Sequence, residues 1–292
     1  MHFSCGIVRP PYEANSCFLQ VTSGCSHNSC RFCTFYKEAP FSVSPDSEII
    51  EDLQEIKRTG IKIKRIFLQG ADPFVLTFEK LKHIMELINT YLYKGISVGC
   101  YSRVDSLKNK TVEQLKELKN IGFDMIVFGI ESGDDFVLEK MNKGYKSNDI
   151  LEQLSKMDKA GMHYSVIFLY GLGGHNYGMK SAINTAEILN KLSPSRVLAS
   201  GLSIFPDTPL MAEIKRGEFI EADETEKIKE LKTFVSSLNI QTVLDATNVS
   251  NLAPVFGILP DDKDKILNIL NAALDKYNEQ YLRFQRKNMS NL

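Results

Sequence analysis

Short apolar runs alternate with amphipathic stretches along most of this chain. The first run, Cys17 to Val21, is rich in strand-forming residues and ends shortly before Gly24, so it predicts a β-strand. In the next stretch, Ile49, Leu53 and Ile56 recur at helical spacing, which predicts a helix over residues 47–57. The chain therefore begins with a predicted strand, a loop and a helix.

The same alternation continues to about residue 204. Further strands are predicted at residues 66–68, 96–101, 125–130, 165–170 and 197–204, and helices at 78–93, 111–121, 150–160 and 179–192. The strands are mostly apolar and end in turns of small residues, which favours a parallel sheet covered by helices. The pattern alone does not separate a doubly wound sheet from an incomplete barrel.

The pattern changes after Thr208. It predicts a charged amphipathic helix from Glu224 to Leu238, a short run over residues 241–244, and one final helix from Asp261 to about Arg286. We therefore expect two parts, an α/β part over residues 1–210 and a mostly helical C-terminal extension over 211–292 that packs on the first part.

Composition and charge narrow the class of protein. The chain has 292 residues, of which 43% are hydrophobic and 24% charged, as expected for a globular protein with a sizeable core. The formal net charge of −1 and the lack of a dense basic run do not favour a nucleic-acid partner. No targeting segment or apolar membrane span is visible, so we expect a cytoplasmic protein that does not enter a membrane.

The six cysteines are sparse for this length and come without a secretion signal, so a disulfide framework is the weaker interpretation. Cys5, Cys17 and Cys100 are expected to be thiols. The other three, Cys25, Cys30 and Cys33, lie within nine residues directly after the first predicted strand. This spacing suits a metal centre on one short loop.

Two kinds of metal centre compete for this loop. Structural zinc usually takes four ligands, and no second cysteine pair stands nearby, although His27 can complete a zinc knuckle. An iron–sulfur cluster can instead be held by three cysteines, which leaves one iron open for a substrate or cofactor. The three-cysteine pattern favours the cluster.

At this point the sequence resembles the radical S-adenosylmethionine (radical SAM) superfamily. Its hallmark is three closely spaced cysteines on the loop after the first barrel strand, with an aromatic residue before the last one. Phe32 occupies that place here, and the resemblance implies that it contacts the cofactors. The first gap is four residues in this chain, where the commonest family spacing is three. The resemblance implies a partial (β/α)6 TIM-like barrel with its chemistry at the C-terminal ends of the strands. It also implies a [4Fe–4S] cluster on the three cysteines and bound SAM.

The resemblance implies further cofactor contacts at the strand ends. Gly70-Ala71-Asp72 looks like a variant of the family's Gly-Gly-Glu motif, which binds the SAM amino group chiefly through backbone carbonyls. Gly129-Ile130-Glu131-Ser132-Gly133 resembles the form found in the elongator-type, methylthiotransferase and anaerobic coproporphyrinogen oxidase branch, and it places Glu131 toward the ribose hydroxyls. Lys143 matches that branch's basic position and is expected to pair with the SAM carboxylate. Each charge also has a plainer interpretation, Glu131 as a buried acid and Lys143 as a solvated lysine.

Further positions correspond to cofactor contacts by their place at strand ends. They are Ser102, Arg103, Gly171 in the run Gly171-Leu172-Gly173-Gly174, and Phe205 in the segment that closes over adenine. Arg103 is equally consistent with a salt bridge at the end of the barrel. The glycine run also suggests a phosphate loop, but no Gly-Lys-Ser/Thr follows it. Tyr36, Tyr101 and His175 are candidates for catalytic or substrate-contacting groups.

We therefore predict a radical SAM enzyme in which the cluster and SAM generate a 5′-deoxyadenosyl radical that abstracts hydrogen from a substrate. The reaction can end in methylation, sulfur insertion, dehydrogenation or rearrangement. No second cysteine cluster, RNA-binding appendage or cobalamin domain is visible, so a small-molecule substrate fits best, with flavodoxin or ferredoxin as electron donor. The alternative is a non-catalytic iron–sulfur protein that carries electrons or metal.

Overall fold

The computed structural model describes residues 1–288, and the chain divides into two compact units. Unit 1 comprises residues 1–28, 35–129 and 153–164. Unit 2 comprises residues 29–34, 130–152 and those from 165 onward. The boundary crosses the cysteine loop, so Cys25 belongs to unit 1 and both Cys30 and Cys33 belong to unit 2.

Unit 1 is built on parallel strands in the order β1-β4-β5-β6. These strands are β1 (Cys17–Gln20), β4 (Arg65–Gln69), β5 (Ser97–Ser102) and β6 (Ile126–Glu131), whose last two residues belong to unit 2. A small antiparallel pair, β2 (Thr22–Ser23) with β3 (Ser42–Val43), frames the start of the cysteine loop. The four predicted strands of this region are confirmed.

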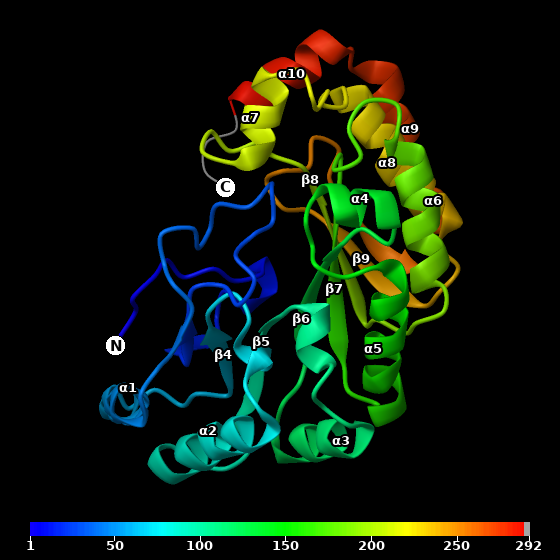
Figure 1. The fold of residues 1–292 in the computed structure, drawn as a ribbon. Coiled ribbons are helices and arrows are strands. Elements are labelled where there is room, and N and C mark those ends of the chain that lie inside the picture. The colour runs from blue at the N-terminus through cyan, green and yellow to red at the C-terminus, as the bar shows by residue number, and fades with distance from the viewer. Residues whose placement is uncertain (289–292) are drawn as a thin grey trace. The chain divides into compact units, whose positions relative to one another are not determined.

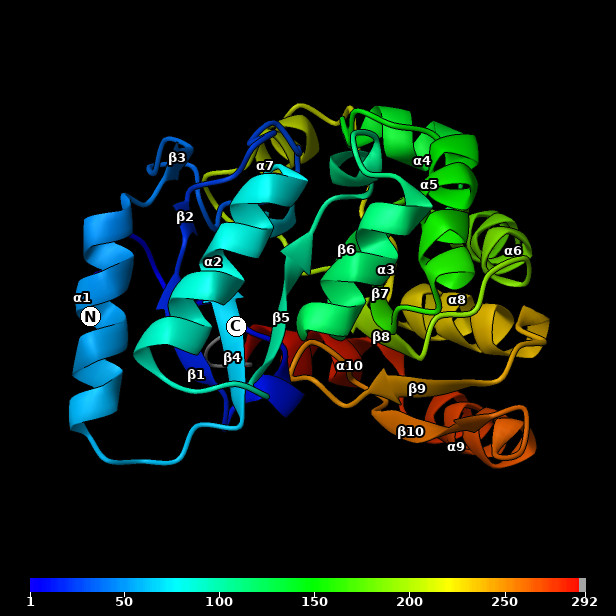
Figure 2. The same cartoon turned by 90° about the horizontal axis from the view of Figure 1, so that it is seen from below.

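Three helices follow the strands of unit 1 and lie side by side (Figure 2). They are α1 (Asp46–Arg58), α2 (Phe78–Tyr91) and α3 (Val112–Ile121), and α5 (Ser147–Ala160) ends in this unit as well. Local sequence sets their ends: Thr77 caps α2, and Thr111 and Gln114 form a capping box on α3. Gly122 ends α3 with a φ of 122°, a conformation that a residue with a Cβ rarely adopts.

Unit 2 continues with strands in the order β7-β8-β9-β10. Their bounds are β7 (Tyr164–Tyr170), β8 (Arg196–Gly201), β9 (Thr242–Ala246) and β10 (Val255–Leu259). Strands β7, β8 and β9 are parallel, and β10 runs antiparallel to β9. The predicted strand over residues 197–204 is thus shorter than expected, and the predicted extension contributes two strands besides its helices.

Helix α8 lies between α6 and α9 in unit 2 (Figure 1). The helices of this unit are α4 (Asp135–Lys140), α6 (Gly178–Leu189), α7 (Pro209–Lys215), α8 (Glu224–Ser237), α9 (Lys263–Lys276) and α10 (Glu279–Lys287). The prediction of one helix from Asp261 to about Arg286 was wrong. Tyr277 is extended, and the Asn278 side chain accepts the amide of Tyr281, so a second helix starts there.

A compact apolar cluster in unit 2 joins the short helices α4 and α7 to the three loops that follow β7, β8 and α7. Its buried members are Val137, Met141, Leu172, Leu202, Leu210 and Phe219. Two of these residues flank predicted cofactor segments, because Met141 precedes Lys143 and Leu172 follows Gly171. The cluster therefore holds those segments in place by burial of apolar side chains.

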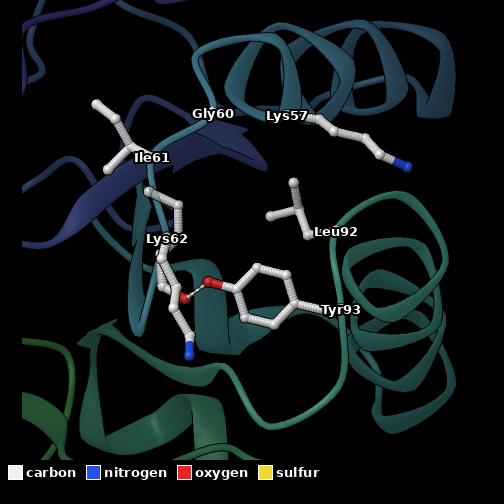
Figure 3. A pocket seen from close by; sticks show the side chains of 7 residues that line it. Lys57, Gly60, Ile61, Lys62, Leu92 and Tyr93 are labelled. Atoms are coloured by element: carbon white, nitrogen blue, oxygen red, sulfur yellow. Dashed lines mark hydrogen bonds between the residues drawn. The ribbon is translucent and has the colours of Figure 1, made fainter.

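A surface pocket of 380 Å³ in unit 1 lies near the amino ends of strands β4 and β5 (Figure 3). Its lining residues precede β4 and β5, namely Lys57, Gly60, Ile61, Lys62, Ile63, Leu92 and Tyr93. The Tyr93 hydroxyl donates to the Ile63 carbonyl there. Because chemistry in parallel α/β barrels gathers at the carboxyl ends of strands, we assign this pocket no part in the candidate site.

Within the described part of the chain, every helix is too short or too polar to cross a bilayer.

Candidate functional site

The cysteine loop follows the short strand β2, and none of its cysteines is in a disulfide. All six cysteines lie within residues 1–288, and no disulfide forms among them. Asn28, inside the four-residue first gap, has a φ of 46°, and its amide donates to Cys25 Sγ at 3.4 Å. Its side-chain amide donates to the Tyr36 carbonyl at 2.9 Å. The additional residue of the gap is thus accommodated by an asparagine in the left-handed region, which asparagine tolerates better than most residues.

The second half of the loop is anchored within unit 2. The Arg31 amide donates to the Met141 carbonyl at 3.1 Å, and the Leu210 amide donates to the Arg31 carbonyl at 3.0 Å. The half-buried Phe32 packs against the apolar cluster that contains Met141 and Leu210. Phe32 therefore holds Cys30 and Cys33 against the segment that leads to Lys143, and its predicted cofactor contact stays a prediction.

In unit 1 the predicted Gly70-Ala71-Asp72 motif lies against the start of the cysteine loop. The Ala71 amide donates to the Gly24 carbonyl at 3.2 Å. Gly70 has a φ of 120°, and a Cβ at this position would lie 2.1 Å from Thr22 Oγ1. Only glycine fits this close approach, so the residue type is fixed by the packing of β2 against the end of β4.

The Asp72 carboxylate is fully buried and binds three donors within unit 1. It accepts Ser26 Oγ at 2.6 Å, Ser106 Oγ at 2.6 Å and the Arg103 amide at 3.1 Å. Burial raises the pKa of this carboxyl, and the three hydrogen bonds oppose that shift. The side chain therefore joins the cysteine loop to the ends of two strands. Because the carboxylate already accepts three hydrogen bonds from the protein, we expect Asp72 to contact the cofactor through its backbone.

The predicted contacts at the end of β5 have local partners. Ser102 Oγ donates to the Arg103 carbonyl at 2.9 Å, and Arg103 Nη2 donates to Asp105 Oδ2 at 3.0 Å. The salt-bridge interpretation of Arg103 is therefore realised in the structure. Tyr101 packs edge-on to Phe67 with ring centroids 5.3 Å apart. Roles of these residues toward a cofactor or substrate stay predictions.

Glu131 and Lys143 form an ion pair in unit 2. Lys143 Nζ lies 3.3 Å from Glu131 Oε1, and the two side chains are 5% and 13% exposed. The Ser132 amide donates to the Ile130 carbonyl at 2.8 Å, and Glu131 between them has a φ of 62°. This γ-turn of the positive-φ form is rare and strained, and it ends β6 at the carboxylate. The structure thus brings together the two charged residues that the sequence predicts to bind SAM.

Ser132 has a different environment from its neighbour Glu131. Its hydroxyl is buried and lies 3.1 Å from Ser181 Oγ on α6. The Gly133 amide donates to Thr185 Oγ1, also on α6, at 2.8 Å. Ser132 therefore fixes the end of β6 to α6, and its predicted cofactor contact stays a prediction.

Gly171 begins the glycine run after β7 and receives support from a residue that the sequence did not reveal. Its amide donates to Glu230 Oε2 on α8 at 2.8 Å, and Glu230 is 1% exposed. Burial raises the pKa of Glu230 to about 8, against the opposing effects of the Gly171 hydrogen bond and the Lys227 charge. In the sequence, Glu230 resembles any other charged residue of an amphipathic helix. Its contact with this loop depends on the tertiary fold, which places α8 there.

The remaining predicted residues lie in surface or turn positions. The Phe205 carbonyl accepts Thr208 Oγ1 at 2.8 Å just before α7 begins. His175 Nδ1 lies 2.9 Å from Glu226 Oε2, and the histidine side chain is 43% exposed. Tyr36 is buried, and its backbone carbonyl holds Asn28 as described above. None of these geometries by itself assigns a catalytic role.

Comparison with known proteins agrees with the family that the sequence resembles. Residues 19–186 match the family described as the radical SAM superfamily. A Methanocaldococcus jannaschii protein, uncharacterized protein MJ0486, is 26% identical over 272 residues, which cover 88% of this chain and 83% of that protein. The Bacillus subtilis heme chaperone HemW is 29% identical over 174 residues, and the match covers 57% of this chain and 45% of HemW. The chain thus spans about half the length of HemW.

Solved structures show the same fold at low sequence identity. Coproporphyrinogen III oxidase (HemN) from Escherichia coli, described as a radical SAM enzyme, aligns with a TM-score of 0.57 and 16% identity over 76% of this chain and 51% of HemN. This likeness confirms the predicted TIM-like partial barrel as the fold class.

Proposed function

The chain belongs to the radical SAM superfamily, with a [4Fe–4S] cluster and SAM as its cofactors, and we propose that it uses them to abstract hydrogen from a small-molecule substrate. It is a radical SAM enzyme whose reaction subclass is open. The observation that carries the proposal is the set of three closely spaced cysteines, none of them in a disulfide, on the loop that follows the first strands of the sheet.

The residues present suit these cofactors. Cys25, Cys30 and Cys33 are the proposed cluster ligands, and three ligands leave one iron open. Two of the remaining cysteines have other surroundings in unit 1. Cys5 Sγ lies 4.0 Å from Gln20 Oε1, and Cys100 is fully buried. Burial raises the pKa of Cys100, which keeps its thiol protonated and a poor metal ligand. The bound cofactors together supply a 5′-deoxyadenosyl radical. The chain's own part is to bind and orient the cofactors and the substrate and to exclude water from the site.

Three polar elements are proposed to bind SAM. The carbonyls around Gly70 and Ala71 accept hydrogen bonds from its amino group, and Lys143 binds its carboxylate by a charge-assisted hydrogen bond. Glu131, oriented by its γ-turn, accepts hydrogen bonds from the ribose hydroxyls. Because Lys143 and Glu131 pair with each other at 3.3 Å, both are held in rigid positions before SAM arrives.

The proposal is tested by SAM cleavage. The full chain, purified and reconstituted with iron and sulfide without oxygen, is incubated with dithionite and SAM, and 5′-deoxyadenosine is measured by chromatography. We expect a brown chromophore and 5′-deoxyadenosine from the natural chain, with flavodoxin or ferredoxin as the proposed electron donor in the cell. Cys30→Ala should lose both signals, whereas Cys5→Ser should keep both because Cys5 lies outside the loop.

Two outcomes contradict the proposal. A reconstituted chain that binds zinc in place of iron has no electron to deliver. A cluster whose four irons all have protein ligands, with no 5′-deoxyadenosine formed, supports the non-catalytic electron carrier instead.

A further inference from the structure

Two loops of unit 1 form the 380 Å³ pocket near the amino ends of β4 and β5, which the proposed function does not use (Figure 3). The first loop, residues 59–64, joins α1 to β4, and the second, residues 92–96, joins α2 to β5. The Tyr93 hydroxyl donates to the Ile63 carbonyl, so a hydrogen bond connects the two loops. The volume lies in the range of about 300–1,000 Å³ that is typical of small-molecule sites.

The wall of this pocket is apolar. Leu92 lies at its centre beside the Tyr93 ring, and Ile61 lies on the first loop (Figure 3). Ile61 is 67% exposed and Tyr93 is 36% exposed. Because the Tyr93 hydroxyl is occupied by the Ile63 carbonyl, the exposed part of this side chain is mainly its ring. A single exposed isoleucine needs no explanation, but several apolar side chains around one hollow favour an apolar ligand group.

The charge around the pocket has one sign. Residues 57–65 carry five basic side chains and no acidic one, namely Lys57, Arg58, Lys62, Lys64 and Arg65. The second loop adds Lys94 and also contains no acid. The formal net charge of −1 conceals this segment, so the expectation that the chain has no dense basic run is wrong here. A concave surface with charges of one sign attracts ligands of the opposite sign.

Two of these cations line the pocket and have no protein counter-ion. Arg65 is paired with Glu13, whereas within residues 1–288 neither Lys57 nor Lys62 takes part in an ion pair. Lys57 comes from the last turn of α1 and Lys62 from the loop after it, and they lie on opposite sides of Leu92 (Figure 3). Both side chains are exposed and flexible, so each can turn its ammonium group toward an anion in the pocket.

The pocket is far from the proposed SAM contacts of unit 1. It lies before Arg65, the first residue of β4, whereas Gly70 follows the last residue of the same strand. A strand rises about 3.3 Å per residue, so the five steps from Arg65 to Gly70 span about 16 Å. A ligand in the pocket is therefore too distant to be the substrate of a radical formed beside Gly70.

We propose that this pocket binds a small organic anion with an apolar body, as a ligand distinct from the radical substrate. Its carboxylate or phosphate group pairs with Lys57 and Lys62 through charge-assisted hydrogen bonds. Its apolar body packs on Leu92, Ile61 and the Tyr93 ring. A free small molecule fits better than a membrane surface, because Leu92 and Ile63 are half-buried in a hollow that a flat bilayer does not reach.

The first test measures which chemical class the pocket binds, by fluorine NMR on the full chain with cluster and SAM but no reductant. The probe is 4-(trifluoromethyl)benzoate, for which we expect saturable binding that weakens as sodium chloride is raised. The neutral 4-(trifluoromethyl)benzamide has the same body, and trifluoroacetate has the charge without the ring. Both should bind at least threefold more weakly than the benzoate. Equal binding of benzoate and benzamide would overturn the proposal.

The second test locates the bound probe. Lys57→Gln and Lys62→Gln should each weaken benzoate binding about two- to fivefold, as expected for exposed ion pairs, and leave benzamide binding unchanged. Lys146→Gln, an exposed lysine of unit 2, is the matched control and should change neither. Leu92→Trp should fill the pocket and abolish binding of both probes, with a circular dichroism spectrum like that of the natural chain. Unchanged benzoate binding in both lysine variants would place the probe elsewhere and overturn the proposal.

A third measurement distinguishes a free anion from a lipid headgroup. The chain is sedimented with vesicles of phosphatidylglycerol and, separately, of phosphatidylcholine, and we expect it to stay in solution with both. Sedimentation with phosphatidylglycerol that Lys57→Gln and Lys62→Gln abolish, without benzoate binding, would replace the pocket by a membrane-binding surface. None of these measurements needs SAM cleavage, so they test the pocket independently of the proposed function.

Discussion

Lys143 Nζ lies 3.3 Å from Glu131 Oε1, and both side chains are largely buried in unit 2. Twelve residues separate them in sequence, and the γ-turn at Glu131 and the packing of Met141 bring them together. The pair has two consequences, one for folding stability and one for cofactor affinity. A double-mutant cycle separates the two.

In the absence of SAM, we expect Glu131→Gln and Lys143→Met each to lower the free energy of unfolding by about 1–3 kcal/mol, since each leaves one buried group without its partner. The double variant should recover most of this loss because no unpaired charge remains. Urea denaturation measures all four proteins. Additive losses in the double variant would show that the two side chains do not interact.

SAM affinity should behave differently. Both single variants and the double variant should bind SAM at least tenfold more weakly, a change of about 1.4 kcal/mol or more. Restored stability therefore does not restore binding in the double variant. Isothermal titration with SAM checks this, with Lys146→Met on the exposed surface as the control that leaves affinity unchanged. Natural affinity in the double variant would remove both residues from the SAM site.

Ser26→Ala should weaken the attachment of the cysteine loop to Asp72 without unfolding unit 1. One buried hydrogen bond is lost, so we expect a decrease of about 2–4 °C in melting temperature. Because the loop start becomes less constrained, the cluster should be lost faster on exposure to a chelator, as measured by the decay of its visible absorbance.

Asp72→Ala is the matched comparison. It removes the acceptor of Ser26, Ser106 and the Arg103 amide together, so it should destabilise the protein more than Ser26→Ala. If Ser26→Ala alters neither melting temperature nor chelation rate, the Ser26 hydrogen bond does not hold the loop.

Glu230 should make stability depend on pH. Its pKa in the folded protein, about 8, lies above the ordinary value of 4.5, so the folded state binds more protons between these values. The stability that this group contributes is therefore complete below pH 4.5 and is lost as the pH rises through 8. Glu230→Gln keeps an acceptor for the Gly171 amide but does not titrate.

The melting temperature of Glu230→Gln should accordingly approach that of the natural chain at pH 5 and exceed it increasingly up to pH 8. The expected gap is several degrees, since 1 kcal/mol corresponds to about 2–4 °C for a domain of this size. Calorimetry in a pH series measures it. A constant gap over this range would show that Glu230 does not titrate there.

Sequence patterns predict elements with a strong period and miss short or interrupted ones. The apolar runs of β1 and β4 to β8 were predicted because each is bounded by small residues. Helices α4 and α7 span only about two turns, too few for a helical period to stand out. The break at Tyr277 was missed because Asn278 acts there as a cap, which a continuous amphipathic pattern conceals.

The candidate site was predicted as residue types at strand ends, and its internal contacts were not. The three cysteines and Glu131 stand out because their spacing carries chemical meaning. The pairing of Glu131 with Lys143, the three donors on Asp72 and the contact of Glu230 with Gly171 depend on which elements are adjacent. Hydrogen-bond satisfaction is a property of the folded chain, so no linear pattern reports it.

The positive φ of Glu131 opposes two properties of this chain, the stability of its backbone and the binding of SAM that we propose for the carboxylate. A residue with a Cβ in the left-handed region costs about 1–2 kcal/mol, and glycine relieves it. Glycine at position 131 would also remove the carboxylate that pairs with the buried Lys143, so a library selected only for survival of heating should become enriched in glycine at 131 together with an uncharged residue at 143. We expect such doubly changed survivors to bind SAM weakly.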